Sequence, residues 1–207
     1  MKVDIESTVM YYRKKAMDLA LRYESASVQK LQMDLRDAME RRRSVIELGC
    51  GSGRDAAFLQ RNGNIGSLRA TDASPELLRE AGRLHPELKD VLGELVLPIG
   101  LEKLVAAGER FSGIYSIATL MHLSPADIAE TIGLLERISE PGGILFISVC
   151  TEREEGMFPD PRTYTLRSPG WWKKAIEKGG FRTVELKITS DGLGRDGTSW
   201  LNITSVL

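Results

Sequence analysis

The chain has few cysteines and few histidines. Of its 207 residues, two are cysteine, Cys50 and Cys150, and two are histidine, His85 and His122. Neither cysteine belongs to a CxxC motif or to a Cys/His spacing, so the sequence predicts neither a disulfide framework nor a metal site. Isolated thiols are typical of a reducing compartment, which favours a cytoplasmic location.

The chain also lacks long apolar runs and an excess of either charge. No run approaches the ~18 apolar residues of a membrane span, and residues 1–20 lack the apolar stretch of a signal peptide, so no membrane partner is expected. Lys and Arg number 28 against 29 Asp and Glu, a formal net charge of -1. Without a net positive field, nucleic acid is not an expected partner. The oligomeric state stays open.

The composition is that of a folded globular chain, with 42% hydrophobic and 28% charged residues. This length suits one hydrophobic core, so we expect a single domain over residues 1–207. Residues 1–43 show the apolar spacing of two helices, and a core of a different pattern follows over residues 44–207.

Short apolar runs alternate with amphipathic segments through most of that core. The pattern predicts strands at residues 44–48, 68–71, 91–92, 113–118 and 144–149, and helices at residues 54–61, 75–84, 101–107, 125–138 and 168–178. Such alternation predicts a parallel sheet with helices on both faces. The tail differs, because residues 181–189 and 199–206 both alternate in the β sense around a glycine-rich segment and predict an antiparallel hairpin.

A glycine-rich turn follows the first predicted strand. Glu47 lies within the last two residues of the run at residues 44–48, and Gly49, Gly51 and Gly53 alternate into a helix. Alternating glycines at such a turn favour close approach of a ligand, while the alternative is a tight turn without one. Arg54 stands where a dinucleotide fingerprint has its third glycine. Glu47 would repel a pyrophosphate and attract a cationic or zwitterionic ligand, which argues against NAD.

Asp72 lies about 20 residues after the turn, at the end of the second predicted strand. A carboxylate at that distance accepts hydrogen bonds from the hydroxyls of a ribose. The alternative interpretation is an aspartate that caps the helix beginning at Pro75. The preceding glycine turn favours ribose.

Together these motifs resemble those of the class I S-adenosylmethionine-dependent methyltransferases. The resemblance extends from about residue 11 to the C-terminus and is carried by ELGCGSGRD at 47–55, TDASPELL at 71–78, ATLMHL at 118–123, EPGGIL at 140–145 and GGF at 179–181. It implies a Rossmann-like, doubly wound sheet of seven strands, mostly parallel with a C-terminal antiparallel hairpin. It also implies an enzyme with S-adenosylmethionine as its cofactor.

The resemblance assigns the methionine and ribose ends of the cofactor. It implies that Glu47 and the loop at Gly49 and Gly51 hold the methionine portion, with the ammonium at the carboxylate. The methionine carboxylate would face the amides at the start of the helix that begins at Arg54. Asp72, with Ala73 beside it, would hold the ribose hydroxyls.

The resemblance also suggests which residues contact the adenine of the cofactor and which residue covers the cofactor. Glu94 would accept a hydrogen bond from the adenine amino group in place of the usual aspartate, and Leu95 would pack near the ring. Ile117, after the fourth strand, would line the cofactor. Tyr12 would cover it as part of the N-terminal helices at residues 1–43, unless it is a plain core aromatic.

His122 is the candidate general base for an acceptor that must lose a proton, because histidine titrates near neutrality and this one follows the fourth strand. The alternative is a histidine that orients the following helix. His85, at a helix end, is expected at the surface. Arg153 or Arg162, in the segment at residues 151–165, would clamp an anionic group of the acceptor or would simply be solvated. At most one of Trp171 and Trp172 would wall an aromatic acceptor.

The sequence therefore predicts a methyltransferase acting on a small molecule, since no added substrate domain or basic surface is evident. Two rival hypotheses are a protein that senses S-adenosylmethionine without turnover and a nicotinamide-dependent oxidoreductase. The acceptor itself is left open.

Overall fold

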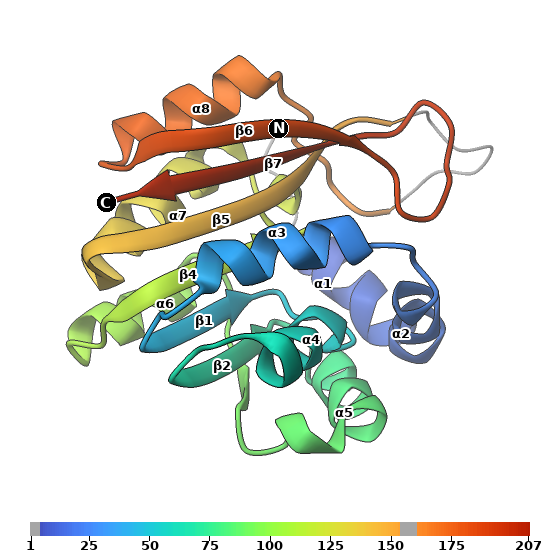
Figure 1. Ribbon diagram of the computed structural model, residues 1–207. Coiled ribbons are helices and arrows are strands. Elements are labelled where there is room, and N and C mark those ends of the chain that lie inside the picture. The colour runs from blue at the N-terminus through green and yellow to red at the C-terminus, as the bar shows by residue number, and fades with distance from the viewer. Residues whose placement is uncertain (1–4, 154–160) are drawn as a thin grey trace.

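The structure is a computed structural model that describes residues 5–153 and 161–207. Its centre is a sheet of seven strands in the order β3-β2-β1-β4-β5-β7-β6 (Figure 1). The strands are β1 (Ser44–Leu48), β2 (Ser67–Asp72), β3 (Leu92–Glu94), β4 (Phe111–Ile117), β5 (Ser139–Glu152), β6 (Arg182–Ser190) and β7 (Ser199–Val206). The first five run parallel, and β7 pairs antiparallel with both β5 and β6. The predicted fold class is confirmed.

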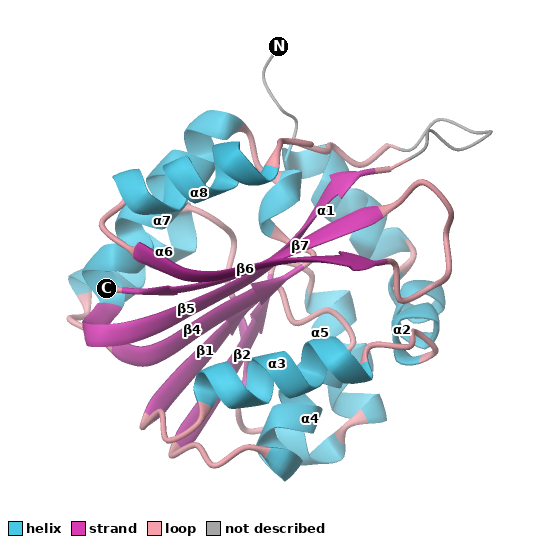
Figure 2. Ribbon diagram, turned by 45° about the horizontal axis from the view of Figure 1, so that its top comes forward, coloured by secondary structure: helices cyan, strands magenta, loops and turns pink. Residues whose placement is uncertain are grey.

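Helices cover both faces of this sheet (Figure 2). They are α1 (Ile5–Lys14), α2 (Ala16–Glu24), α3 (Gln29–Met39), α4 (Arg54–Asn62), α5 (Pro75–Leu84), α6 (Ile99–Ala106), α7 (Pro125–Ile138) and α8 (Pro169–Lys178). Among the described residues, no helix combines the length and the apolar character that crossing a membrane requires.

Two clusters of buried side chains form the core, one on each face. Leu104, Ile132 and Ile176 bring α6, α7 and α8 onto one face, and Met39 and Leu59 bring α3 and α4 onto the other. Successive residues of a strand point to opposite faces, so a strand buried on both sides needs a continuous apolar run. This is why the central strands show in the sequence as short, predominantly apolar runs.

The order in which the chain adds strands to the sheet reverses at β1. The chain moves outward from β1 to β2 and β3, then returns to place β4 on the other side of β1. Ligands of open parallel sheets bind at the carboxyl ends of the strands beside such a switch point. The glycine turn that follows β1 lies at this place.

The N-terminal region forms three helices, not the two expected. The chain departs from helical geometry at Lys15, with φ of -113°, and again between α2 and α3. Met10, Met17 and Leu21 recur at helical spacing in the sequence, and in the structure they are 45%, 60% and 53% exposed. Short residues, Ala16 and Ala20, pack instead, because helices approach closely where side chains are small. The three exposed side chains of α1 and α2 therefore do not belong to the buried face, whereas Leu35 and Met39 of α3 are fully buried.

Three helices begin with the same Ser-Pro pair. Ser74, Ser124 and Ser168 each accept a hydrogen bond from the backbone N–H three residues ahead, and a proline follows each serine. Serine is a preferred N-cap and proline suits the first helical position, so these starts are fixed locally. The predicted start at Pro75 is confirmed.

Candidate functional site

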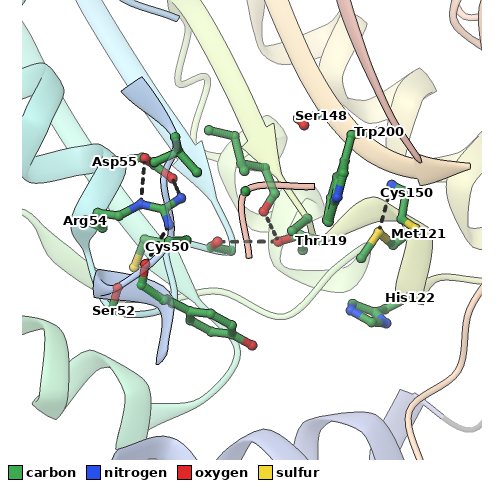
Figure 3. A pocket seen from close by; sticks show the side chains of 18 of the residues that line it. Cys50, Ser52, Arg54, Asp55, Thr119, Met121, His122, Ser148, Cys150 and Trp200 are labelled. Carbon is green, nitrogen blue, oxygen red and sulfur yellow. Dashed lines mark hydrogen bonds and ion pairs between the residues drawn. The ribbon is translucent and has the colours of Figure 1, made fainter. Parts of the chain in front are cut away.

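A cavity of about 460 Å³ opens at the carboxyl ends of the strands (Figure 3). The glycine turn, the end of β2 and the end of β4 form one side of it. The N-terminal helices contribute Tyr12 and Tyr23, and the β6–β7 hairpin contributes Trp200 and Asn202. Segments far apart in the sequence thus enclose one space at the switch point.

The glycine turn has a backbone that only glycine adopts easily. Gly49, Gly51 and Gly53 have φ of 82°, 56° and 81°, in the left-handed region that disfavours residues with a Cβ. The N–H groups of Gly49 and Cys50 both donate to the carbonyl oxygen of Thr71 at 2.8 Å, which fixes the turn to β2. A Cβ at Gly51 would meet nothing closer than Tyr23 Cδ2 at 3.6 Å. The turn leaves an open cradle there for a ligand.

Asp72 connects this turn to the next loop. Its Oδ2 accepts from the Gly51 N–H at 2.9 Å, and its Oδ1 accepts from the Ser74 N–H at 2.8 Å. Burial raises the pKa of its carboxyl, while these hydrogen bonds act in the opposite direction. The carboxylate lines the cavity with lone pairs left over for a ligand, because each carboxylate oxygen accepts more than one hydrogen bond.

Glu47 lies deeper, at the wall of the cavity, and is 1% exposed. The hydroxyl of Tyr115 donates to its Oε2 at 3.0 Å. Burial raises the pKa of Glu47 well above its ordinary value, and the nearby charge of Asp55 adds to this. A cation that binds here would favour the charged carboxylate and would gain from the low dielectric.

Arg54 is held at the start of α4 by two partners. Its Nε and Nη2 donate to the carboxylate of Asp55 at 3.1 and 2.7 Å, and its Nη1 donates to the carbonyl oxygen of Tyr23 at 2.7 Å. Gln32 on α3 donates to the same carboxylate at 3.0 Å. Asp55 and Tyr23, which sequence reasoning did not single out, thus join α2, α3 and α4 beside the glycine turn.

His122 and Tyr12 meet on the other side of the cavity. His122 Nδ1 lies 2.7 Å from the carbonyl oxygen of Thr163, which has no proton, so Nδ1–H is the donor. In the neutral imidazole, Nε2 then accepts from the Tyr12 hydroxyl at 2.8 Å. The Tyr164 ring packs edge-on against the imidazole, with centroids 4.7 Å apart. Burial raises the pKa of Tyr12, so its hydroxyl keeps its proton.

Nearly all the residues predicted for the cofactor lie along this cavity, namely Tyr12, Glu47, Gly49, Gly51, Arg54, Asp72, Ala73, Leu95 and Ile117, together with His122. Glu94 does not. It pairs with Asp72 across β2 and β3, but its side chain is 53% exposed and lies 4.0 Å from Arg13. Leu95 and Val96 line the cavity instead, where the chain leaves β3.

One further expectation, the exposure of His85, is wrong, and two expectations that the sequence left open can be compared with the cavity. His85 is buried rather than at the surface, because α2 packs beside it and Glu24 Oε1 lies 3.1 Å from its Nε2. Trp172 is buried in the core and Trp171 packs against that core, so neither lines the cavity. Arg153 and Arg162 do line it, and both guanidinium groups lie against the Tyr164 ring. Glu154 and Glu155 lie outside the described residues.

Several cavity residues were not anticipated. They are Ser148, Cys150, Met121, Trp200 and Asn202, from β5, the segment after β4, and β7. The alternation of β7 places Trp200 and Asn202 on one face of the strand, which was the available signal. The sequence did not indicate that this face of β7 lines the same cavity as the glycine turn.

Comparison with known families gives one match. The profile of the family described as "Methyltransferase domain" matches residues 45–143, which span β1 to the start of β5. That range contains the glycine turn, Asp72 and His122.

One curated relative is similar in sequence. It is a polyketide synthase-nonribosomal peptide synthetase of Aspergillus clavatus, 26% identical over 167 residues. The aligned part is 70% of this chain but 4% of that protein, so the chain spans a small part of the relative's length.

Solved structures share the fold. A 1,6-didemethyltoxoflavin-N1-methyltransferase of Burkholderia thailandensis, with 1,6-didemethyltoxoflavin and S-adenosylhomocysteine bound, superimposes with a TM-score of 0.73 at 18% identity, covering 97% of this chain and 87% of that one. DhpI in complex with S-adenosylhomocysteine gives a TM-score of 0.65 at 19% identity, with 96% and 95% covered. These similarities show the fold.

The sheet order and the cavity at its switch point define a Rossmann-like α/β protein with a ligand site at the carboxyl ends of its strands. Residues 45–143 match the methyltransferase domain family, and the fold is that of solved methyltransferase structures, so the cofactor to consider for this cavity is S-adenosylmethionine. The described residues fit that cofactor, because an open glycine cradle lies between two buried carboxylates, Glu47 and Asp72.

Proposed function

We propose that this protein transfers the methyl group of S-adenosylmethionine to a small-molecule acceptor. One observation carries the proposal: a single continuous cavity is lined by the glycine turn, Glu47 and Asp72 and, on its other side, by His122, Tyr12 and Trp200. A cofactor held by the first group would place its reactive end toward the second.

Each part of the cofactor would bind residues of matching chemistry. Glu47 would bind the ammonium, the cradle at Gly51 would admit the methionine portion, and Asp72 would bind the ribose hydroxyls. Leu95 and Ile117 would supply apolar surface on either side of Asp72. When bound, S-adenosylmethionine supplies an electrophilic methyl group on a sulfonium, and its transfer needs alignment and a dry pocket more than a dedicated catalyst.

An acceptor that must lose a proton would give it to the Tyr12–His122 pair. His122 Nε2 already accepts from the Tyr12 hydroxyl, so a proton leaves the acceptor either to Nε2 after Tyr12 moves aside or through the tyrosine oxygen. The Thr163 carbonyl holds the imidazole in the tautomer with a lone pair on Nε2. This pair would act as the general base.

The enclosure of the cavity supports a small acceptor. Tyr12, Tyr23 and Tyr164 close over it from segments outside the sheet, and Arg162 lies 5.0 Å from the Tyr11 ring and 5.3 Å from the Tyr164 ring. Arg153 and Arg162 would receive an anionic group of the acceptor as charge-assisted hydrogen-bond donors.

The test is methyl transfer from labelled S-adenosylmethionine to a metabolite extract, followed by identification of the labelled product. The proposal expects a labelled small molecule and an equal amount of S-adenosylhomocysteine. Binding of S-adenosylmethionine with no labelled product and no S-adenosylhomocysteine would contradict it. It would favour a protein that senses the cofactor.

A variant of His122 tests the base with the same assay. His122→Asn keeps an N–H donor for Thr163 but has no basic nitrogen, so we expect turnover to fall by roughly 10²-fold or more with cofactor affinity nearly unchanged. The wild-type rate should fall at acid pH, where a protonated imidazole can no longer accept a proton, and the variant should lose that dependence. Equal rates for both proteins across the pH range would make His122 structural.

A further inference from the structure

Asn202 has an unusual position in the cavity wall. It lies on β7, is 4% exposed, and lines the cavity. Within the described part of the chain, neither its Oδ1 nor its Nδ2 has a hydrogen-bond partner. A buried carboxamide normally pairs both groups, because each unpaired group loses its hydration without compensation.

Other buried polar atoms lack partners as well, but they differ from Asn202 in two respects. They belong to Arg13, Arg42, Thr131, Trp172, Thr183 and Ser205. None of these residues lines the cavity, and each leaves one atom unpaired. Asn202 leaves both a donor and an acceptor unpaired, and it is a residue of the cavity wall.

The neighbours of Asn202 complete a recognition surface. Ser148 on β5 is its register partner, so the two side chains lie next to each other on one face of the sheet, and Ser148 also lines the cavity. Trp200, two residues earlier on β7, lies on the same face and points into the pocket (Figure 3). Its Nε1 donates to Asp191 Oδ1 at 2.9 Å, and Arg195 holds that carboxylate in turn. The indole is therefore fixed in orientation.

This surface is separate from the cofactor residues. Glu47 lies on β1 and the glycine turn directly follows it, and the strand order places β4 and β5 between β1 and β7. Three strand spacings amount to about 14 Å across the sheet. The polar groups of S-adenosylmethionine already have matching partners on β1 and β2, so Asn202 is available for the acceptor.

We propose that Asn202, with Ser148 and Trp200, recognises an acceptor that is a planar ring with a lactam-type edge, in which a ring N–H stands next to a carbonyl. The Asn202 Oδ1 would accept from the ring N–H, and its Nδ2 would donate to the ring carbonyl oxygen, so that one planar carboxamide satisfies both groups of the edge. Trp200 would offer its face to the ring. The inference rests on the proposed function and names its substrate class.

The test compares two ligands by calorimetry on the full chain saturated with S-adenosylhomocysteine. Isoquinolin-1-one carries the lactam edge, and 1-methoxyisoquinoline keeps the ring but lacks the N–H donor. The wild-type protein should bind the lactam at least about tenfold more tightly, since the methoxy compound leaves the Asn202 oxygen unpaired. In Asn202→Leu the ratio should fall to about one. Asn202→Asp, which keeps an acceptor but loses the donor to the ring carbonyl, should keep a preference for the lactam but bind it more weakly than the wild-type protein does.

Ser205→Ala provides the matched control. Ser205 lies on β7, is buried with an unpaired hydroxyl, and does not line the cavity. Its variant should keep the full preference for the lactam. Removing an unpaired buried polar group should not lower the melting temperature in either Ser205→Ala or Asn202→Leu.

Three outcomes would overturn the inference. They are equal binding of the two ligands or binding of neither by the wild-type protein, an unchanged preference in Asn202→Leu, and a tenfold or greater loss of S-adenosylmethionine affinity in Asn202→Leu. The last would place Asn202 at the cofactor. Selective lactam binding without methyl transfer to any acceptor would support the lactam site at Asn202 and contradict only the proposed methyltransferase activity.

Discussion

Glu47 and Asp72 are both buried carboxyl groups, yet their surroundings differ. Asp72 accepts two backbone hydrogen bonds, which favour its charged form, whereas Glu47 receives one hydroxyl and lies near Asp55. A buried charge with few donors is expensive, and an opposite charge offsets that cost. The ammonium of the cofactor is such a charge, so Glu47 should be the residue whose protonation is most strongly linked to binding.

The linkage has a definite sign. Because burial raises the pKa of Glu47 in the folded chain, its contribution to stability is present below the unfolded pKa and is lost as the pH rises through the raised value. The cofactor-free protein should therefore lose stability over that interval. S-adenosylmethionine affinity should rise over the same interval, since the cation favours the carboxylate.

Glu47→Gln should separate these effects. The amide oxygen can still accept from Tyr115, but no charge remains, so affinity for S-adenosylmethionine should fall by about 1.5–3 kcal/mol. The melting temperature of the free protein at high pH should not fall, and both pH dependences should flatten. Thermal unfolding and calorimetry across the pH range measure this. Wild-type affinity in the variant would contradict the electrostatic role of Glu47.

Asp72→Ala tests the ribose assignment. Loss of a charge-assisted pair should weaken S-adenosylmethionine binding by roughly 2 to 3 kcal/mol. The variant also leaves the N–H groups of Gly51 and Ser74 unpaired, so its melting temperature should drop by several degrees. Asp72→Asn keeps an acceptor oxygen but loses the charge. Relative to Asp72→Ala, it should therefore recover more of the melting temperature than of the affinity for S-adenosylmethionine. Unchanged affinity in Asp72→Ala by calorimetry would show that the ribose lies elsewhere.

At the scale of elements, prediction succeeded where the determinants are local. The strand at residues 44–48 and the helices at 75–84 and 125–138 appear with the predicted bounds, because apolar runs and Ser-Pro caps lie within the segments themselves. β5 is longer than predicted, since its ends are fixed by pairing of Ser139 with Phe111 and of Glu152 with Ser199. Such pairing partners are distant in the chain and leave no local pattern.

The candidate site also combines features with local sequence signals and features that depend on contacts between distant residues. The glycine turn and Asp72 could be recognised because both follow strands at fixed spacing. The contact of Tyr12 with His122 joins residues 110 positions apart, and the orientation of β7 toward the cavity depends on the sheet order. The exposure of Glu94 likewise follows from how the chain leaves β3, which no residue pattern indicated.

The turn after β1 gives a prediction at this scale. Gly49→Ala should lower the melting temperature strongly, because the new Cβ would collide with the Thr119 side chain in addition to straining the backbone. Gly51→Ala meets no such obstacle, so it should cost less stability while still weakening S-adenosylmethionine binding by filling the cradle. Thermal unfolding and calorimetry distinguish the two. Greater destabilisation by Gly51→Ala than by Gly49→Ala would contradict this account of the turn.

At the scale of the whole molecule, the proposed roles divide along the chain. The family match at residues 45–143 contains the glycine turn, Asp72 and His122. The wall proposed for the acceptor comes largely from outside it, from Tyr12 in α1 and from Trp200 and Asn202 in β7. The account therefore places cofactor chemistry in the shared domain and acceptor selection in the segments that flank it.

We propose that one cavity holds the cofactor between Glu47 and Asp72, with the cofactor sulfur facing Tyr12, His122 and Trp200. A crystal structure of the complex with S-adenosylhomocysteine tests this most directly. The account predicts the ribose hydroxyls within hydrogen-bond distance of Asp72, the ammonium on the side of Glu47, and the sulfur toward His122 and Trp200. A ligand bound outside this cavity, or one with its sulfur directed away from these residues, would contradict it.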